Sequence, residues 1–440
     1  MAMPRAFDPT LQQLRTLLQR PSMDSQVLEE TVRGILAQVR SQGDRALFAY
    51  EAQFDHARLD SLEVSAQEMD EARTLVPQEL QVAIRRAMGN IRRFHLAQQP
   101  KAEQVETEPG IRCWRRIVPI QTVGLYIPGG SAPLFSTVLM LSIPAGIAGC
   151  GQIVLATPPR PDGTIHPAIL LAAALGGVTR IVKLGGAQAI AALAYGTQTI
   201  PRVDKIFGPG NRFVTMAKQL VSANTCAIDL PAGPSEVMVV ADSSSEPTFA
   251  AADLLSQAEH GPDSQTILVV QAKDASEGAA FLDRVDACLE KQLVGLERRQ
   301  LAAQALGHSK AVVVTSIDRV VQVINSYGPE HLIVMTADPD PIVAQVVNAG
   351  SVFIGKWSPE SAGDYASGTN HTLPTAGWAC SYSGVSVDSF IKKITYQQLA
   401  YEALASLGPT ITTMAKAESL EAHAMAVSIR LATARKEEIL

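Results

Sequence analysis

The sequence is poor in cysteine, and the few cysteines it has are widely spaced. Its 440 residues include Cys113, Cys150, Cys226, Cys288 and Cys380 and no others. This scatter suits neither a cysteine-based zinc site nor a dense disulfide framework. We therefore interpret each cysteine as a small buried hydrophobe rather than as a nucleophile.

Long apolar runs and clusters of like charge are also missing. The stretch STVLMLSIPAGIAG contains Pro144 and is shorter than the roughly 20 residues that a membrane helix needs. The net charge is -6 at pH 7 and no basic cluster indicates nucleic acid, so we expect small molecules or copies of the same chain as partners. The N-terminal residues MAMPRAFDPTLQQL lack the pattern of a secretory leader, which favours a cytoplasmic protein.

Composition and hydrophobic pattern indicate an α/β protein with two or more domains. Apolar residues make up 47% and charged residues 18% of the chain, as in ordinary globular enzymes. In residues 10–98, apolar side chains recur at intervals of three and four positions, so this region is expected to be helical. From about residue 115, short strands such as QIVLAT, RIVK and TILVVQ alternate with Ala-rich helices, which predicts βαβ units on two parallel sheets. Residues 386–440 have no strong strand signal and are expected to be helical.

Three turns that contain glycine are expected between strands and helices: LYIPGG at 125–130, LGGAQ at 184–188 and FGPGN at 207–211. Ligands of open parallel sheets bind beyond the carboxyl ends of the strands. There, a glycine turn lets backbone N–H groups approach a phosphate at a helix N-terminus. The usual G-x-G-x-x-G fingerprint is absent, so each turn alone indicates only a tight turn, whereas three together favour nucleotide binding.

Two pairs of polar residues lie next to apolar runs. Gln257 and His260 in DLLSQAEHGPDSQ stand three apart, so they are either surface residues of a helix end or half of a metal site. Glu330 and His331 in GPEH enter the strand LIVM, where a base would face a cleft, although such a pair is more often a capped turn.

Two further pairs lie nearer the C-terminus. The stretch SAGDYASGTNHTLPT is expected to be a loop, and its small residues give no packing reason for Asp364 or His371. Glu418 and His423 in AESLEAH are five apart, on adjacent rather than coincident helical faces. The sequence alone does not explain that pair.

Four of these side chains together form a set of nitrogen and oxygen donors without a thiolate: Gln257, His260, Asp364 and His423. Such a set suits Zn²⁺ in a site left open for substrate, and Mn²⁺ or Co²⁺ would also fit. From spacing alone, this metal site is one hypothesis among several.

Several longer motifs resemble the histidinol dehydrogenase family. They are GLYIPGGSAPLFSTVLML, GGAQAIAALAYGT, VDKIFGPGN, DLPAGPSEV, DLLSQAEHGPDSQ, YGPEHL and SPESAGDYASGTNHTLPT. The resemblance begins near residue 25 and continues to the C-terminus. It implies a zinc-dependent homodimer that oxidises L-histidinol to L-histidine through the aldehyde, with reduction of two NAD⁺, as the last step of histidine biosynthesis.

The resemblance also implies a domain organisation, with two incomplete Rossmann-like parallel-sheet domains and small helical extensions in an intertwined homodimer. On that pattern, residues 1–21 form an N-terminal helical extension and 386–440 a C-terminal helical extension that reaches the partner subunit. Residues 22–125 together with 236–385 form the first Rossmann-like domain, and 126–235 form the second.

Roles for individual residues follow from the same resemblance. His331 matches the family's general base and Glu330 its neighbouring acid/base residue. The positions that match metal ligands are Gln257, His260, Asp364 and His423, one of them from the partner subunit. The positions that match substrate contacts are Ser235, Gln257, His260, His331, Asp364, His371, Glu418 and His423. The positions that match NAD contacts are Tyr126, Gln188 and Asn211.

The chemistry of histidinol is consistent with these roles. Its imidazole and amine are good zinc ligands, so the metal would orient the substrate. A neutral His331 would take the alcohol proton as hydride leaves for the nicotinamide, and Glu330 would activate the water that hydrates the aldehyde.

Other functions stay open on the sequence alone. A zinc hydrolase would use the same metal set but would leave the glycine turns without a role. A dehydrogenase for another polar alcohol would keep the fold and the metal, and His371 and Glu418 would then discriminate between substrates. A non-catalytic binding protein is disfavoured, because it would not need His331, Glu330 and an open metal together.

Overall fold

The computed structural model describes residues 3–20, 25–129, 132–230 and 233–437. These residues separate into two compact units, one formed by Met1–Gln98 with Ile120–Phe390 and one formed by Gln99–Pro119 with Ile391–Leu440. No helix within the described ranges is both long and apolar enough to cross a membrane.

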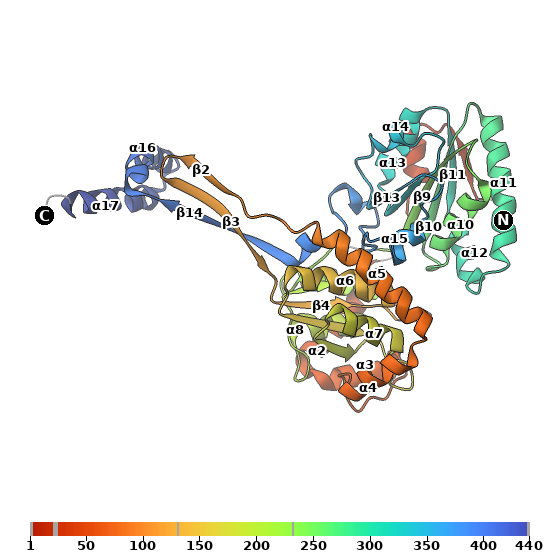
Figure 1. The fold of residues 1–440 in the computed structure, drawn as a ribbon, viewed down its shortest axis with the longest axis horizontal. Helices are drawn as coiled ribbons and strands as arrows, with labels where there is room; N and C mark the ends of the chain where they lie inside the picture. The colour runs from red at the N-terminus through yellow and green to blue at the C-terminus, as the bar shows by residue number, and fades with distance from the viewer. Residues whose placement is uncertain (1–2, 21–24, 130–131, 231–232, 438–440) are drawn as a thin grey trace. The chain divides into compact units, whose positions relative to one another are not determined.

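A six-stranded parallel sheet forms one half of the first unit (Figure 1). Its strands, in spatial order, are β1 (Arg5–Phe7), β11 (Lys310–Val314), β10 (Gln265–Gln271), β9 (Glu236–Asp242), β12 (His331–Val334) and β13 (Ser351–Ile354). One face packs on α10 (Pro247–Ala258), α11 (Ala275–Leu293) and α12 (Arg299–His308), and the other on α1 (Leu11–Leu17), α13 (Ile317–Tyr327) and α14 (Asp340–Val343). The central strands β9 and β10 are mostly apolar, with polar residues toward their ends, because both of their faces are covered.

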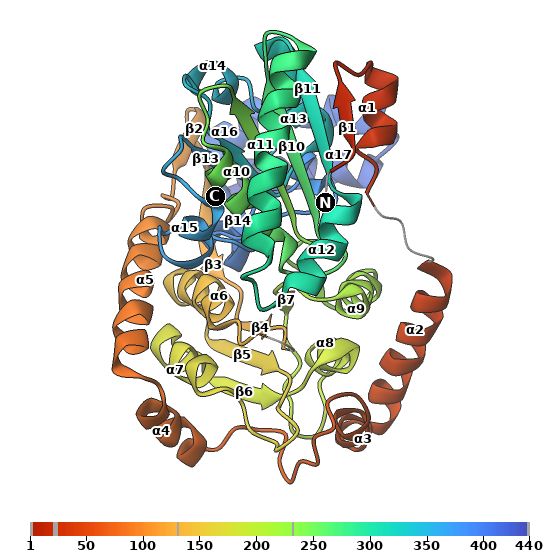
Figure 2. The same cartoon turned by 90° about the vertical axis from the view of Figure 1, so that its right-hand side faces the viewer.

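A five-stranded parallel sheet forms the other half of the first unit (Figure 2). Its strands, in spatial order, are β6 (Arg180–Lys183), β5 (Gln152–Thr157), β4 (Thr122–Tyr126), β7 (Lys205–Phe207) and β8 (Ala227–Ile228). One face packs on α4 (Ala66–Leu75), α5 (Gln78–Leu96), α6 (Phe135–Ala148) and α7 (Pro167–Gly176). The other face packs on α2 (Ser25–Gln42), α3 (Asp44–Phe54), α8 (Gly186–Tyr195) and α9 (Arg212–Ser222).

The strand order identifies the point in each sheet where the winding direction reverses. In the five-stranded sheet, the chain runs from β4 outward through β5 and β6, and then returns to β7 on the other side of β4. In the six-stranded sheet, it runs from β9 outward through β10 and β11, and then returns to β12 on the other side of β9. Crevices at such switch points are where open α/β sheets bind ligands.

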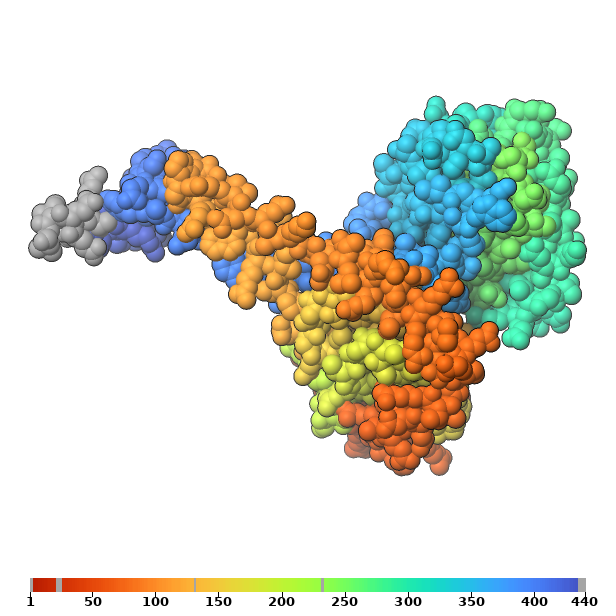
Figure 3. All heavy atoms as spheres, viewed as in Figure 1, coloured from red at the N-terminus to blue at the C-terminus, as the bar shows by residue number. Residues whose placement is uncertain are grey.

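The second unit contains an antiparallel sheet and two helices. The sheet has the order β14 (Ile391–Leu399), β3 (Ile111–Pro119) and β2 (Gln104–Glu108), and the helices are α16 (Tyr401–Ala417) and α17 (Glu421–Glu437). All five residues of β2 are exposed, and this strand's atoms are visible in orange in the space-filling view (Figure 3).

The structure corrects two sequence predictions about the termini. Residues 386–440 were expected to be helical, but β14 is a nine-residue strand within them. Most of its side chains are exposed, so no buried face imposes the alternating pattern that marks a strand in a sequence. Residues 1–21 were expected to form a helical extension, but β1 pairs with β11 in the six-stranded sheet.

The helices between residues 25 and 96 also differ from the predicted grouping. They were expected to belong with residues 236–385, whereas they pack on both faces of the five-stranded sheet. The helical pattern itself is confirmed, since α2 to α5 occupy this region. The remaining domain boundaries stay a prediction.

The cysteines differ in burial more than we expected. Cys226 is buried, but Cys113, Cys150 and Cys288 are partly exposed and Cys380 is exposed. Cys380 lies at the end of a short 3₁₀ turn, Trp378–Cys380, which explains its exposure.

Candidate active site

The pair Glu330 and His331 lies at the amino edge of the six-stranded sheet. His331 is the first residue of β12 and is in register with Val237, next to the start of β9. Glu330 Oε2 accepts a 2.8 Å hydrogen bond from the backbone N–H of Glu236. His331 Nδ1 lies 3.3 Å from the backbone oxygen of Glu236 and 3.7 Å from Glu330 Oε2. Both side chains are buried.

Burial and neighbouring charges shift the pKa values of this pair in the same direction. Burial is the main cause that raises the pKa of Glu330, to about 8. Burial alone would lower the pKa of His331, but the carboxylates of Glu330 and Asp364 outweigh it and raise that pKa to about 10. His331 Nε2 lies 3.3 Å from Asp364 Oδ1, and together they form an ion pair. A neutral His331 therefore requires another positive charge to take the place of the imidazolium beside Asp364.

The C-terminal end of α10 contributes Gln257 and His260. The helix ends at Ala258, and the N–H of His260 donates to the Gln257 carbonyl oxygen at 3.2 Å, so this stretch is the helix end that the sequence predicts. Gln257 is fully buried, yet neither its Oε1 nor its Nε2 has a hydrogen-bond partner among the described residues. His260 is exposed at the residue level.

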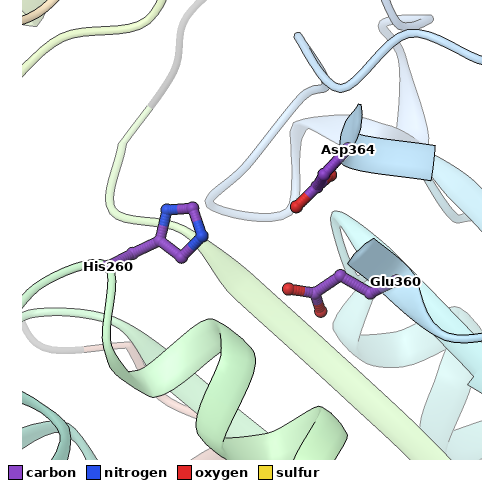
Figure 4. A group of neighbouring side chains, drawn as sticks. All are labelled: His260, Glu360 and Asp364. Carbon is purple, nitrogen blue, oxygen red and sulfur yellow. The ribbon is translucent and has the colours of Figure 1, made fainter. Parts of the chain in front are cut away.

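Asp364 lies on the short helix α15 (Glu360–Tyr365) rather than in the loop that the sequence suggested. Glu360 is one turn before it, so both carboxylates project from the same face of α15. Ligand atoms of His260, Glu360 and Asp364 all lie within 4.8 Å of one another, and Figure 4 shows the three side chains directed into a common space. The sequence analysis missed Glu360, although its spacing of four from Asp364 in SPESAGDY was a usable signal.

This group of residues fits a divalent cation. Buried atoms without a hydrogen-bond partner in the described chain include both amide atoms of Gln257, Oε2 of Glu360 and Oδ1 of Asp364, the last of which has only the ion pair with His331. A polar atom left in this state costs about 1–3 kcal/mol, unless a ligand satisfies it. Burial raises the pKa of Asp253 to about 7, and burial together with nearby carboxylates raises that of Glu360 well above its ordinary value. The donors are nitrogen and oxygen, as Zn²⁺ or Mn²⁺ accepts.

His371 links this cluster to the five-stranded half of the unit. Its Nδ1 lies 2.8 Å from the backbone oxygen of Asp364, and its Nε2 lies 3.0 Å from Thr137 Oγ1 on α6. Burial lowers the pKa of His371, which favours the neutral ring. Ser235 lies beside the cluster, since it directly precedes Glu236 at the start of β9.

Glu236 is a second residue that the sequence analysis missed. Its carboxylate accepts hydrogen bonds from Arg20 Nη2 at 2.8 Å and from the N–H of Ala376 at 2.8 Å. Its backbone N–H and oxygen contact Glu330 and His331. The available signal was a carboxylate at the first position of the strand EVMVVAD, directly before five apolar residues.

The three predicted cofactor residues lie at the carboxyl edge of the five-stranded sheet. Tyr126 ends β4, Gln188 lies in the first turn of α8, and Asn211 caps α9 by accepting from the N–H groups of Phe213 and Val214. The turns that carry Tyr126 and Asn211 follow β4 and β7, which flank the switch point. Gly130 of the first turn lies outside the described residues.

The glycine turns differ in one respect from the prediction that their N–H groups approach a phosphate. The N–H of Gly185 donates to Glu51 Oε1 at 3.3 Å, and that of Gly186 donates to the Tyr126 hydroxyl at 3.1 Å. The N–H of Gly208 donates to Asp229 Oδ2 at 2.7 Å. Side-chain oxygens of the protein thus accept hydrogen bonds from all three of these N–H groups.

Glu418 and His423 belong to the second unit, so the first unit contains the cluster without them. They do not share one helix, because Glu418 follows the end of α16 and His423 lies in the first turn of α17. Ser419 between them has a positive φ of 59°, which separates the two helices. Both Glu418 and His423 are exposed, and their roles stay predictions.

Comparisons with known proteins point to a single family. The family model described as histidinol dehydrogenase matches residues 18–431. A histidinol dehydrogenase of Bacteroides fragilis is 54% identical over 428 residues, which covers 97% of this chain and 99% of that protein. One from Escherichia coli K12 is 50% identical over 432 residues, which covers 98% and 97%. A crystal structure of histidinol dehydrogenase from Elizabethkingia anophelis is 48% identical and has a TM-score of 0.94, over 98% of this chain and 99% of that one.

Proposed function

The chain belongs to the histidinol dehydrogenase family of oxidoreductases, and we propose on this basis that it oxidises L-histidinol to L-histidine through L-histidinaldehyde, using zinc and two NAD⁺. This four-electron oxidation is the last step of histidine biosynthesis. The observation that best supports it is the cluster of buried, unpartnered oxygen and nitrogen donors beside the pair Glu330 and His331. A cytoplasmic location stays a prediction.

We assign the metal to Gln257, His260, Asp364 and His423, with Mn²⁺ or Co²⁺ as possible substitutes for zinc. When bound, zinc would orient the substrate through its imidazole and amine and would add positive charge beside Asp364. That charge favours the neutral form of His331, which is the form a general base needs.

His331 would remove the alcohol proton. Its Nδ1 lies 3.3 Å from the Glu236 carbonyl oxygen, so a proton on Nδ1 can donate there. That contact fixes the tautomer in which Nε2 carries the lone pair. In the first half-reaction, Nε2 takes the hydroxyl proton while hydride passes to NAD⁺, which gives the aldehyde and NADH.

Glu330 would act in the second half-reaction. The aldehyde must gain a water before it can lose a second hydride, and a buried carboxylate at this position can accept a proton from that water. Hydride transfer from the hydrate to a second NAD⁺, with loss of a proton, gives the carboxylic acid. The raised pKa of Glu330 suits a group that both accepts and releases a proton near neutral pH.

We assign substrate contacts to Ser235, His371 and Glu418, in addition to the metal ligands and His331. We assign NAD contacts to Tyr126, Gln188 and Asn211. The protein would work as a homodimer in which Glu418 and His423 reach the active site of the partner subunit, with no nucleic acid or membrane as partner.

A steady-state assay tests this function directly. Purified protein with L-histidinol and NAD⁺ should form two NADH for each histidinol, and histidine should be the product. A matched assay with another amino alcohol that lacks the imidazole should give little NADH. Comparable rates on both substrates would favour a dehydrogenase for a different polar alcohol.

A further inference from the structure

The side-chain amide of Gln257 has hydrogen-bonding groups that no described residue satisfies. Its side chain is fully buried on α10, and neither amide atom has a partner in the described part of the chain. If Oε1 binds a metal, as the proposed function requires, Nε2 still carries two N–H donors in a buried place. Buried donors are almost always paired, so a second group must accept from Nε2.

Glu360 has a buried acceptor oxygen to which no described residue donates. It is 1% exposed on α15, a helix that packs against α10. Its Oε1 accepts from the hydroxyl of Ser256 at 3.3 Å, and Ser256 directly precedes Gln257. Its Oε2 is buried and lacks a hydrogen-bond partner among the described residues. Among the described residues, α15 thus carries an acceptor without a donor, and α10, which contacts it, carries donors without an acceptor.

We propose that Glu360 is a positioning residue that accepts a hydrogen bond from Gln257 Nε2 and thereby directs Gln257 Oε1 toward the metal. The inference rests on the proposed metal-dependent function, and the contact would form when Gln257 rotates to place Oε1 among the donors of His260 and Asp364. Partners of this kind fix the orientation of metal ligands, and their loss weakens metal binding roughly 10–100-fold. We assign Glu360 to orientation rather than to coordination, because Oε1 contacts Ser256 and Oε2 would accept from Gln257 Nε2 in this arrangement.

A double-mutant cycle on metal affinity separates positioning from coordination. The measurement is the Zn²⁺ dissociation constant of metal-free protein, read by competition with a chromophoric chelator, so it does not depend on turnover. Glu360→Ala should weaken zinc binding at least about tenfold. In a Gln257→Ala background, Glu360→Ala should change the constant less than about threefold, because nothing is left to position.

Two further variants control for charge and folding. Glu360→Gln keeps an acceptor oxygen and should lose less affinity than Glu360→Ala. Asp253→Asn removes another buried carboxyl from α10, and it should weaken zinc binding less than about threefold if charge alone is not the cause. Circular dichroism of each metal-free variant should match that of the wild type.

The outcomes distinguish the inference from the function on which it rests. Failure of the wild type to bind zinc would overturn both. Zinc binding by the wild type with an unchanged constant in Glu360→Ala would overturn the inference alone. An equal loss in both backgrounds would make Glu360 a ligand in its own right, and a larger loss in Asp253→Asn than in Glu360→Ala would transfer the role to Asp253.

Discussion

The two parallel sheets of the first unit present their functional residues at opposite edges. The five-stranded sheet carries the predicted cofactor residues at the carboxyl ends of its strands, beside the switch point between β4 and β7. The six-stranded sheet carries Glu330 and His331 where β12 begins, at the amino edge, with Gln257 at the end of α10. The general rule for open α/β sheets predicts a ligand at the first of these edges but not at the second.

The two edges are also built differently. At the carboxyl edge, side chains accept hydrogen bonds from the N–H groups of the glycine turns, as Asp229 does from Gly208. At the amino edge, several carboxyl groups lie around the imidazole of His331, and some buried polar atoms have no hydrogen-bond partner among the described residues. The turn N–H groups described at the first edge are thus paired within the protein, whereas the described residues of the second edge keep unpartnered polar atoms that suit the proposed metal.

Metal removal should have the largest effect on the amino edge. We expect a chelator to abolish activity without unfolding the protein, and Zn²⁺ to restore it, because a site of nitrogen and oxygen ligands holds zinc less tightly than thiolates do. Activity and circular dichroism should be followed in the same samples. Loss of the dichroism signal together with activity would instead indicate a structural metal.

Substitution of the base should have the next largest effect. We expect His331→Asn to lower kcat by about two orders of magnitude or more, since it removes the group that accepts the alcohol proton. Zinc content, measured by elemental analysis, should stay at the wild-type value. Glu330→Gln should slow oxidation of the aldehyde, and a defect confined to the first half-reaction would contradict its role with water.

A substitution at the carboxyl edge should lower the stability of the folded protein. Lys218 and Asp229 form a buried ion pair, and Lys218 Nζ also donates to the Gly208 carbonyl oxygen at 2.8 Å, so the pair holds both sides of that glycine. Asp229→Asn should lower the free energy of unfolding by about 3–5 kcal/mol, because it leaves a buried ammonium uncompensated. It should also raise KM for NAD⁺ more than it lowers kcat.

An exposed ion pair on the same sheet provides the control. Arg180 and Glu63 are 2.8 Å apart with side chains that are 43% and 33% exposed. Glu63→Gln should therefore change the free energy of unfolding by no more than about 1 kcal/mol in chemical denaturation. Equal losses in Glu63→Gln and Asp229→Asn would show that the buried pair has no special role.

The pH dependence of stability gives a further test at the carboxyl edge. Burial and the neighbouring Asp55 raise the pKa of Glu51 to about 9, while Gln188 Nε2 donates to its Oε1 at 3.0 Å. The folded protein holds this proton above the pH at which the unfolded chain releases it, so the group lowers stability as pH rises from about 5 to 8. Glu51→Gln lacks the proton and should gain at least about 1 kcal/mol relative to wild type over that range. A stability difference that does not vary with pH would contradict a protonated Glu51.

Much of the fold follows from local sequence pattern, because most strands are buried on both faces. Stretches such as QIVLAT and TILVVQ are mostly apolar, and they are β5 and most of β10. The strand β14 was missed because its exposed side chains carry no burial signal. The sequence also did not predict which sheet α2 to α5 cover. An amphipathic pattern shows that a helix has a buried face, but it does not show which surface that face contacts.

Residues that share one motif could be grouped from the sequence, as with Gln257 and His260 at the end of α10, although their roles stay predictions. Glu360 and Glu236 were not found because their importance depends on burial beside groups from distant parts of the chain. The raised pKa of His331 was likewise missed, since it depends on Glu330 beside it and on Glu360 and Asp364 from α15.

Complementation between two inactive variants tests the central claim most directly, namely that the donors at the amino edge are completed by His423 from a partner subunit. His260→Asn and His423→Asn are prepared separately, then unfolded, mixed in equal amounts and refolded. In a mixed dimer with two-fold symmetry, one site collects both substitutions and the other collects neither. Random pairing makes about half of the dimers mixed, so about a quarter of wild-type activity should return. A mixture that stays as inactive as its parents, while wild-type protein refolds to full activity, would contradict the shared site.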